Sequence, residues 1–175
     1  MQIREATIDD AENIKNVHLQ AFDDSEARVV SALAVSLLKE NHPVKIISLV
    51  AIEGNEIVGH IAFSPVFVES TGDHFAYILA PLAVSPKYQK TKIGSSLVRY
   101  GLDIISDRGS FVVFVYGDPQ YYSRFGFNTD LAMNFIPPYT LQFPDGWHAL
   151  KLNSTVFPEG GEITCVESLN NPGLW

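Results

Sequence analysis

The fold of this chain is decided by one stretch, residues 82–97, which reads LAVSPKYQKTKIGSSL. Its apolar start is typical of a buried strand that ends, and its apolar positions from Ile93 onward indicate the start of a helix. The polar loop between them carries Lys87, Lys90 and Lys92. The first N–H groups of a helix have no partner inside the helix, and the helix dipole makes them positive. The stretch therefore predicts an anion site.

The charge of this stretch contrasts with that of the whole chain. The 175 residues include 12 Lys and Arg against 20 Asp and Glu, which gives a formal net charge of −8. Residues 87–108 nevertheless hold five positive residues against two negative ones, a net charge of +3. Gly94 lets a phosphate approach the backbone. The negative net charge of the chain argues against nucleic-acid binding. The positive segment 87–108 suits a compact polyanion. The alternative is that its lysines merely lie on a solvated loop.

Composition indicates a single domain over residues 1–175, because 46% of the residues are apolar and the length is typical of one domain. Residues 129–175 are broken up by prolines and glycines and are expected to form a C-terminal extension of strands and loops. The single Cys165 excludes an internal disulfide, and the five histidines lack metal-type spacing, so no metal is expected. Without an apolar leader or a long apolar run, we expect a cytoplasmic protein with no membrane partner.

Periodicity and turn residues predict the order β-α-α-β-β-β-α-β-α-β, a mixed α/β (α+β) layer. The strands are expected at 2–7, 46–52, 57–68, 75–84, 111–116, directly after Phe127, and then at 148–152 and 162–166. The helices are expected after a capping residue at Thr7, at 25–40, at 93–107 and after Gly117, where Asp118 is the expected cap and Pro119 lies in the first turn. Tight turns are expected at 53–56, around Gly54, and at 71–73. Because the middle strands are apolar on both faces, we expect helices on both sides of the sheet.

Pro81 lies inside the apolar run 77–84. Proline has no N–H and does not fit a fully paired central strand. Either the run is an edge strand or contains a bulge, or the ladder opens there. In the last case the backbone groups of Leu82 and Val84 are free to bind an extended ligand, as in strand addition.

Residues 117–127 read GDPQYYSRFGF and place two tyrosines side by side on a short helix. Neighbouring residues of a helix point about 100° apart, so one ring can pack while the other faces a cleft. A phenol, with a pKa of about 10, can donate a proton to a leaving thiolate. The alternative is that Tyr121 and Tyr122 are both boundary residues without a chemical role.

Taken together, these motifs resemble the GNAT superfamily of acyl-CoA N-acyltransferases, and residues 117–127 resemble its YhbS-like branch. The resemblance covers residues 2–127. It implies a GNAT-type mixed, mostly antiparallel central sheet that is flanked by helices and splayed between strands 4 and 5. In such a fold the pantetheine arm of acetyl-CoA lies in the splay, which the match places at 80–82. Acetyl-CoA is therefore the expected cosubstrate, with CoA as the product.

The resemblance also implies roles for single residues. Backbone groups of Leu82, Ala83 and Val84 would bind the pantetheine, and the Leu82 N–H would polarise the thioester carbonyl. The pyrophosphate would be bound by backbone N–H groups of Gln89, Lys90, Thr91, Lys92, Ile93, Gly94 and Ser95, with Tyr121 completing the cofactor site. Lys92 stands where the family has a glycine, so either its charge compensates or the affinity for the cofactor is reduced.

Tyr122 matches the general acid of many family members, and His60 is the candidate general base. Glu69, His74 and an ordered water are alternatives to His60, which lies in an apolar strand and is equally expected as a hydrogen-bonded core residue. His18 is expected at the surface, with a position facing the acceptor groove as the alternative.

The implied reaction is direct attack of a neutral amine on the acetyl thioester in a ternary complex, so Cys165 is not required. The acceptor would be a small-molecule amine or a protein amine, and a homodimer is a further expectation from the resemblance. A non-catalytic acyl-CoA-binding or sensor domain is the alternative, motivated by Lys92. A scaffold that keeps only the fold is a third hypothesis.

Overall fold

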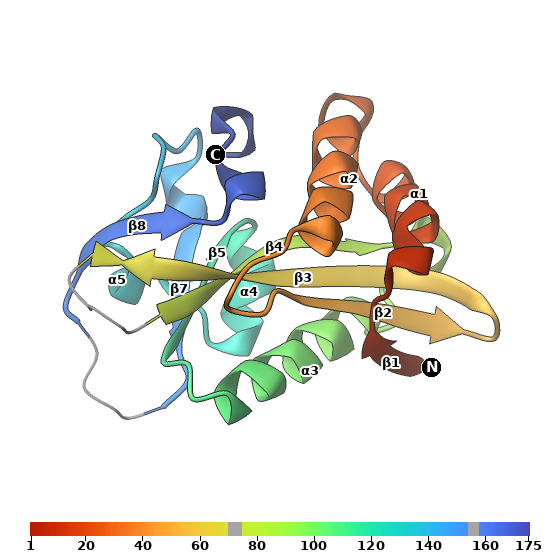
Figure 1. The fold of residues 1–175 in the computed structure, drawn as a ribbon, viewed down its shortest axis with the longest axis horizontal. Helices are drawn as coiled ribbons and strands as arrows, with labels where there is room; N and C mark the ends of the chain where they lie inside the picture. Colours follow the sequence, from red (N-terminus) through yellow and green to blue (C-terminus); the bar gives the residue numbers. More distant parts are fainter. Residues whose placement is uncertain (70–74, 154–157) are drawn as a thin grey trace. The chain divides into compact units, whose positions relative to one another are not determined.

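The computed structural model describes residues 1–69, 75–153 and 158–175, so the turn expected at 71–73 and His74 lie outside the described residues. Among the described residues, the main sheet has the strand order β1-β2-β3-β4-β5-β7 (Figure 1). Its strands are β1 (Gln2–Glu5), β2 (Ile47–Glu53), β3 (Glu56–Val68), β4 (Phe75–Val84), β5 (Val112–Tyr116) and β7 (Trp147–Lys151). The helices are α1 (Ala11–Ala21), α2 (Asp24–Lys39), α3 (Ile93–Asp107), α4 (Pro119–Tyr122) and α5 (Thr129–Ala132).

The chain forms two compact units, and β3, β4 and α3 each contribute residues to both. The first unit comprises residues 1–63 and 80–101 with Leu174, and the second comprises 64–79 and 102–173 with Trp175. The mixed α/β class and the mostly antiparallel sheet expected from the sequence are confirmed.

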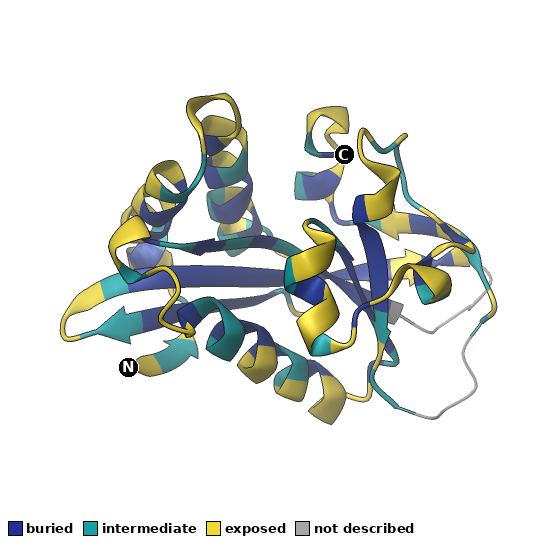
Figure 2. Cartoon of the chain, turned by 180° about the vertical axis from the view of Figure 1, so that it is seen from behind, coloured by how far each residue is buried: buried dark blue, intermediate teal, exposed yellow. Residues whose placement is uncertain are grey.

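In the first unit, β1, β2 and β3 form an antiparallel meander. The hairpin between β2 and β3 turns at Gly54, whose φ of 60° is a conformation that glycine adopts without strain. Most of β3 is buried (Figure 2). Successive side chains of a strand point to opposite faces, so His60 of β3 contacts His18 of α1, whereas Gly59 lies against Ile93 and Leu97 of α3. Helices therefore cover both faces of these strands, as the sequence predicts.

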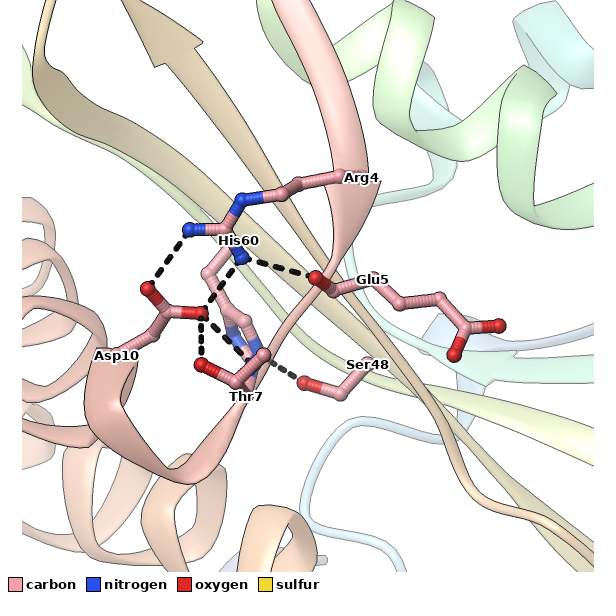
Figure 3. Close-up of polar contacts among 6 residues, drawn as sticks. All are labelled: Arg4, Glu5, Thr7, Asp10, Ser48 and His60. Atoms are coloured by element: carbon pink, nitrogen blue, oxygen red, sulfur yellow. Dashed lines mark hydrogen bonds and ion pairs between the residues drawn. The ribbon is translucent and has the colours of Figure 1, made fainter.

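An ion pair ties β1 to the start of the first helical segment (Figure 3). Arg4 donates to both carboxylate oxygens of Asp10, at 2.7 and 2.9 Å. Asp10 also accepts the backbone N–H and the hydroxyl of Thr7, at 2.7 and 3.1 Å. The Asp10 side chain is nearly buried, and the bond from Arg4 holds the pKa of this carboxyl well below its usual range. Thr7 and Asp10 thus form the helix start that the sequence predicts.

In the second unit, β4 pairs in parallel with β5 through Tyr77, Ile78 and Leu79, and β5 pairs antiparallel with β7. The described β4–β5 ladder ends at Leu79, although β4 itself continues to Val84, and the Ala80–Pro81 peptide bond is cis. The short β6 (Phe135–Ile136) pairs in parallel with β8 (Gly161–Cys165), which also pairs with the end of β3. Residues beyond 129 therefore add strands, as expected.

The strand expected directly after Phe127 is wrong. Asn128 makes only an isolated bridge to Ala149, and the chain then enters the short helix α5. The side-chain oxygen of Asn128 accepts the N–H of Leu131 at 3.0 Å and so caps this helix.

The Arg4–Asp10 ion pair is expected to stabilise the folded chain, and this contribution can be measured. We expect Asp10→Asn to lower the free energy of unfolding at pH 7 by about 1.5–3 kcal/mol, the usual range for hydrogen bonds to a charged group. Because the pKa of Asp10 is lower in the folded than in the unfolded chain, its contribution is full above about pH 4 and declines below it. The difference between the variant and the wild type should shrink in the same range.

Urea unfolding over a pH series measures this difference. Glu12→Gln, which removes an exposed carboxylate from the first turn of α1, is the matched control and should unfold like the wild type. An Asp10→Asn protein as stable as the wild type at pH 7 would contradict the role of the pair.

Candidate functional site

The loop between β4 and α3 is held by its own hydrogen bonds. The Ser85 N–H donates to the Val58 carbonyl at 2.8 Å, which continues the contact between β4 and β3. The Gln89 side chain donates back to the Val84 carbonyl at 3.1 Å, and the Thr91 hydroxyl donates to the Tyr88 carbonyl at 2.5 Å. These bonds fix the path of the loop before any ligand is present.

Two lysines of this loop adopt a backbone conformation that is unusual for residues with side chains. Lys90 has a φ of 63° and Lys92 a φ of 72°, both in the left-handed region. A non-glycine residue there is strained by on the order of 1–2 kcal/mol. Lys92, which occupies a position where the resembled family has glycine, thus adopts the conformation for which glycine is suited. The sequence alone gives no signal for this.

The start of α3 presents backbone donors next to these lysines. The first helical bond runs from the Ser96 N–H to the Lys92 carbonyl at 2.9 Å. The N–H groups of Ile93, Gly94 and Ser95 precede it and have no acceptor one helical turn earlier. Lys90 and Lys92 are exposed, so the site combines positive side chains with the positive end of a 15-residue helix. This arrangement can bind a phosphate or a pyrophosphate.

The first unit also holds the end of β4, where the predicted pantetheine contacts lie. Ala83 is buried, whereas Leu82 and Val84 are half-buried. The described β4–β5 ladder ends three residues before Leu82. The structure therefore brings the predicted cofactor residues from Leu82 to Ser95 together in one unit.

Tyr121 and Tyr122 belong to the second unit, on α4. Asp118 caps this helix by accepting the Gln120 N–H at 2.9 Å, and Pro119 occupies its first turn, both as the sequence predicts. The Tyr122 ring is buried and packs edge-on against Tyr121, with ring centroids 5.1 Å apart. Burial raises the pKa of Tyr122, and the nearby Tyr121 and Asp118 raise it further. This phenol therefore keeps its proton at neutral pH.

His60 is enclosed rather than presented to a ligand. Its exposed fraction is 0%. One ring nitrogen lies 2.8 Å from His18 Nε2, and the other lies 2.9 Å from the Ser48 hydroxyl, a contact that Figure 3 shows. The surface position expected for His18 is wrong, since its exposed fraction is also 0%. A general base must reach the proton it removes, which this environment does not provide for His60. Glu69 is exposed at the end of β3.

Burial determines the protonation state of the two histidines. It lowers the pKa of His18 to about 3 and that of His60 well below the usual value, the latter with a further lowering by His18 and a smaller opposite effect of Asp10. His18 Nδ1 is buried without a hydrogen-bond partner among the described residues. Both rings are therefore neutral in the folded chain.

We expect this pair to make the fold less stable as the pH falls. The unfolded chain takes up protons on both rings below a pH of about 6.5, whereas the folded chain does not, so the free energy of unfolding should decrease from pH 7 to pH 5. NMR of the imidazole nitrogens tests the cause directly. Rings that keep their neutral signals over this range support the account, and a titration of either ring near pH 6.5 would contradict it.

Within residues 1–69, 75–153 and 158–175 no three His, Cys, Asp or Glu side chains are grouped so that they could hold a metal ion. None of the helices described there combines the length and the apolar character needed to cross a membrane.

Comparison with known proteins gives consistent matches. The family model of the acetyltransferase (GNAT) domain matches residues 2–129. The uncharacterized N-acetyltransferase YjhQ of Escherichia coli K12 is 32% identical over 162 residues, which cover 90% of this chain and 88% of the relative. The N-acetyltransferase YhbS of the same strain is 34% identical over 120 residues, which cover 67% of this chain and 68% of YhbS.

Two solved structures with ligands are also similar. The structure of Escherichia coli YhbS in complex with CoA has a TM-score of 0.82 and 27% identity, and the match covers 97% of this chain and 92% of YhbS. A GNAT acetyltransferase from Brucella melitensis in complex with acetyl-CoA has a TM-score of 0.70 and 27% identity, and the match covers 97% of both chains.

Proposed function

This chain belongs to the GNAT acetyltransferase family and is an N-acetyltransferase, and we propose that it transfers the acetyl group of acetyl-CoA to a primary amine by direct attack in a ternary complex. The observation that carries the proposal is the loop before α3, where the left-handed Lys92 leads into the unpaired N–H groups at the helix start. The CoA and acetyl-CoA complexes of two similar proteins support the same cosubstrate.

In this proposal the pyrophosphate is bound by backbone N–H groups from Gln89 to Ser95. Lys92 has two opposing effects there, because its left-handed backbone is strained by about 1–2 kcal/mol, whereas its charge attracts the phosphates. Two opposite charges 4 Å apart in water attract each other by about 1 kcal/mol, so the two effects are of similar size. We infer that the charge of Lys92 strengthens cofactor binding, whereas the strain, which is already present without ligand, lowers the stability of the fold.

The pantetheine arm would continue along the end of β4, where Leu82, Ala83 and Val84 supply backbone groups. The Leu82 N–H would donate to the thioester oxygen and stabilise the negative charge that develops there during attack. A carbonyl oxygen has two lone pairs, so Val84 can accept a ligand amide while it accepts from Gln89.

The chemical step needs a proton donor and a proton acceptor. The amine nitrogen would bond to the thioester carbon, the C–S bond would break, and the CoA sulfur would take the proton of the Tyr122 phenol. The surplus proton of the amine would pass to an ordered water, which we favour over His60 because His60 is fully enclosed, and a proton from solvent would then restore the Tyr122 phenol. No acyl-enzyme forms, and burial raises the pKa of Cys165 to about 12, which leaves little thiolate for a nucleophilic role.

The proposed reaction predicts that the purified protein binds acetyl-CoA and releases CoA thiol when an amine is added. Tyr122→Phe should lower kcat by about 10²-fold, the lower range for general acid catalysis, and leave acetyl-CoA binding intact. Tyr100→Phe, which alters an exposed tyrosine of α3, is the matched control.

A thiol assay over a panel of small amines and lysine-containing peptides distinguishes the alternatives. Binding of acetyl-CoA without release of CoA by the wild type over the whole panel would favour the non-catalytic acyl-CoA-binding domain. If acetyl-CoA near millimolar concentration does not shift the melting temperature, the protein does not bind it. Only the third hypothesis, a scaffold that keeps the fold alone, would then remain.

The two effects assigned to Lys92 can be separated by substitution. Lys92→Ala removes the charge but keeps the left-handed strain, and we expect acetyl-CoA binding to weaken about fivefold, as for the loss of about 1 kcal/mol. Lys92→Gly also removes the strain, which is already present without ligand, so it should bind acetyl-CoA about as weakly as Lys92→Ala but unfold at a higher temperature than the wild type.

Calorimetric titration at two salt concentrations measures these affinities. The difference between the wild type and Lys92→Ala should shrink at high salt, because exposed charges are screened. Equal affinity of Lys92→Ala and the wild type at low salt would show that the charge contributes nothing.

A further inference from the structure

Gly117 lies between the end of β5 and the start of α4, directly against the Tyr122 ring. A Cβ placed on Gly117 would be 2.6 Å from Tyr122 Cε2 and 3.3 Å from Cδ2. Its φ lies outside the left-handed range, so alanine can adopt the same backbone conformation. The feature that requires glycine here is the ring of Tyr122, not the backbone.

Other contacts limit where the Tyr122 ring can move. Tyr121 packs edge-on against it at 5.1 Å and Phe127 at 5.8 Å, measured between ring centroids. Tyr121 is itself held by Arg124, whose guanidinium lies 4.3 Å from the ring centroid and whose Nε donates to the Tyr121 carbonyl at 3.1 Å. The ring is thus enclosed by Gly117 and two aromatic side chains.

The position of Gly117 depends in turn on a residue of the C-terminal extension. The Gly117 N–H donates to the Gly146 carbonyl at 2.9 Å, next to the pair Tyr116–Trp147 that ends the β5–β7 ladder. A Cβ on Gly146 would be 3.1 Å from the Gly117 carbonyl oxygen and 3.1 Å from the Tyr116 ring. Two glycines are therefore needed for the chain segments to approach this closely. Gly146 lies beyond residues 2–129, the part matched by the family model.

We propose that Gly117 and Gly146 are positioning residues that set the Tyr122 phenol for proton donation, so that the C-terminal extension takes part in the chemical step. The inference rests on the proposed function of Tyr122 as the general acid. Relief of a 2.6 Å contact to ordinary van der Waals distance requires a shift of about 1 Å, and a misplacement of that size in an active site can lower the rate about 10²-fold.

The main test is a double-mutant cycle between Gly117→Ala and Tyr122→Phe, with kcat and the KM for acetyl-CoA measured by thiol release. We expect Gly117→Ala alone to lower kcat by about 10²-fold with little change in KM. In the Tyr122→Phe background the same change should lower kcat no further, because the hydroxyl that it displaces is already gone. Gly173→Ala, with only the Asn171 side chain near the added methyl, is the control and should retain the wild-type kcat.

Gly146→Ala keeps the test decisive if Gly117→Ala does not fold. Its methyl meets neighbours at 3.1 Å, so it needs a shift of only a few tenths of an ångström, and kcat should fall about threefold to tenfold, again only while Tyr122 is present.

Equal losses of kcat with and without the Tyr122 hydroxyl, or unchanged kcat in the folded glycine variants, would overturn the inference. If Tyr122→Phe itself retains full activity, the general-acid role fails. If Tyr122→Phe is impaired but the glycine variants are not, only the positioning role fails.

Discussion

The constraint on which this structure depends is the missing N–H of Pro81. In a fully paired central strand each N–H donates to one of the two neighbouring strands, and proline has no N–H to supply. The described β4–β5 ladder covers Tyr77, Ile78 and Leu79, and β4 then continues through Pro81 to Val84. The residues that follow the proline are the ones assigned to the cofactor, and the loop to α3 begins directly after them. Pro81 thus lies between the part of β4 that pairs with β5 and the part that is proposed to bind a ligand.

In the loop after β4, lysine residues adopt a backbone conformation that is usual for glycine. Lys92 and Lys90 both adopt left-handed backbones, which glycine adopts more readily. The loop bonds of Gln89 and Thr91 help to hold this path. A strained conformation is kept only where its surroundings determine it, and such positions cluster at functional sites. The departure from the family pattern at Lys92 therefore adds a positive charge to a backbone conformation that glycine also adopts.

The sequence predicts the fold well where local signals are strong. The amphipathic pattern of α3, the cap at Asp118 and the turn at Gly54 each appear as expected, because they depend on residues close together in the chain. The prediction fails after Phe127, where a strand is expected but the capping side chain of Asn128 starts a helix. From one sequence it is hard to decide whether such a side chain caps a helix or the segment forms a strand.

The site is less predictable, because its residues depend on contacts between distant parts of the chain. Burial of His18 and His60 follows from packing of α1 on β3, 42 positions away, which turns a candidate base into an enclosed pair. The contact of Gly117 with Gly146 likewise joins segments that no local pattern connects. By contrast, the loop before α3 was identifiable, because charge, glycine and a helix start coincide within a few residues.

Amide hydrogen exchange with and without acetyl-CoA tests the central claim most directly, since the account assigns the cofactor to backbone N–H groups. Saturating acetyl-CoA should slow exchange at the residues from Gln89 to Ser95 and at Leu82 and Val84, with smaller changes in β1 and β2. Binding that leaves the exchange of these amides unchanged would contradict the assignment of the cofactor to the end of β4 and the start of α3.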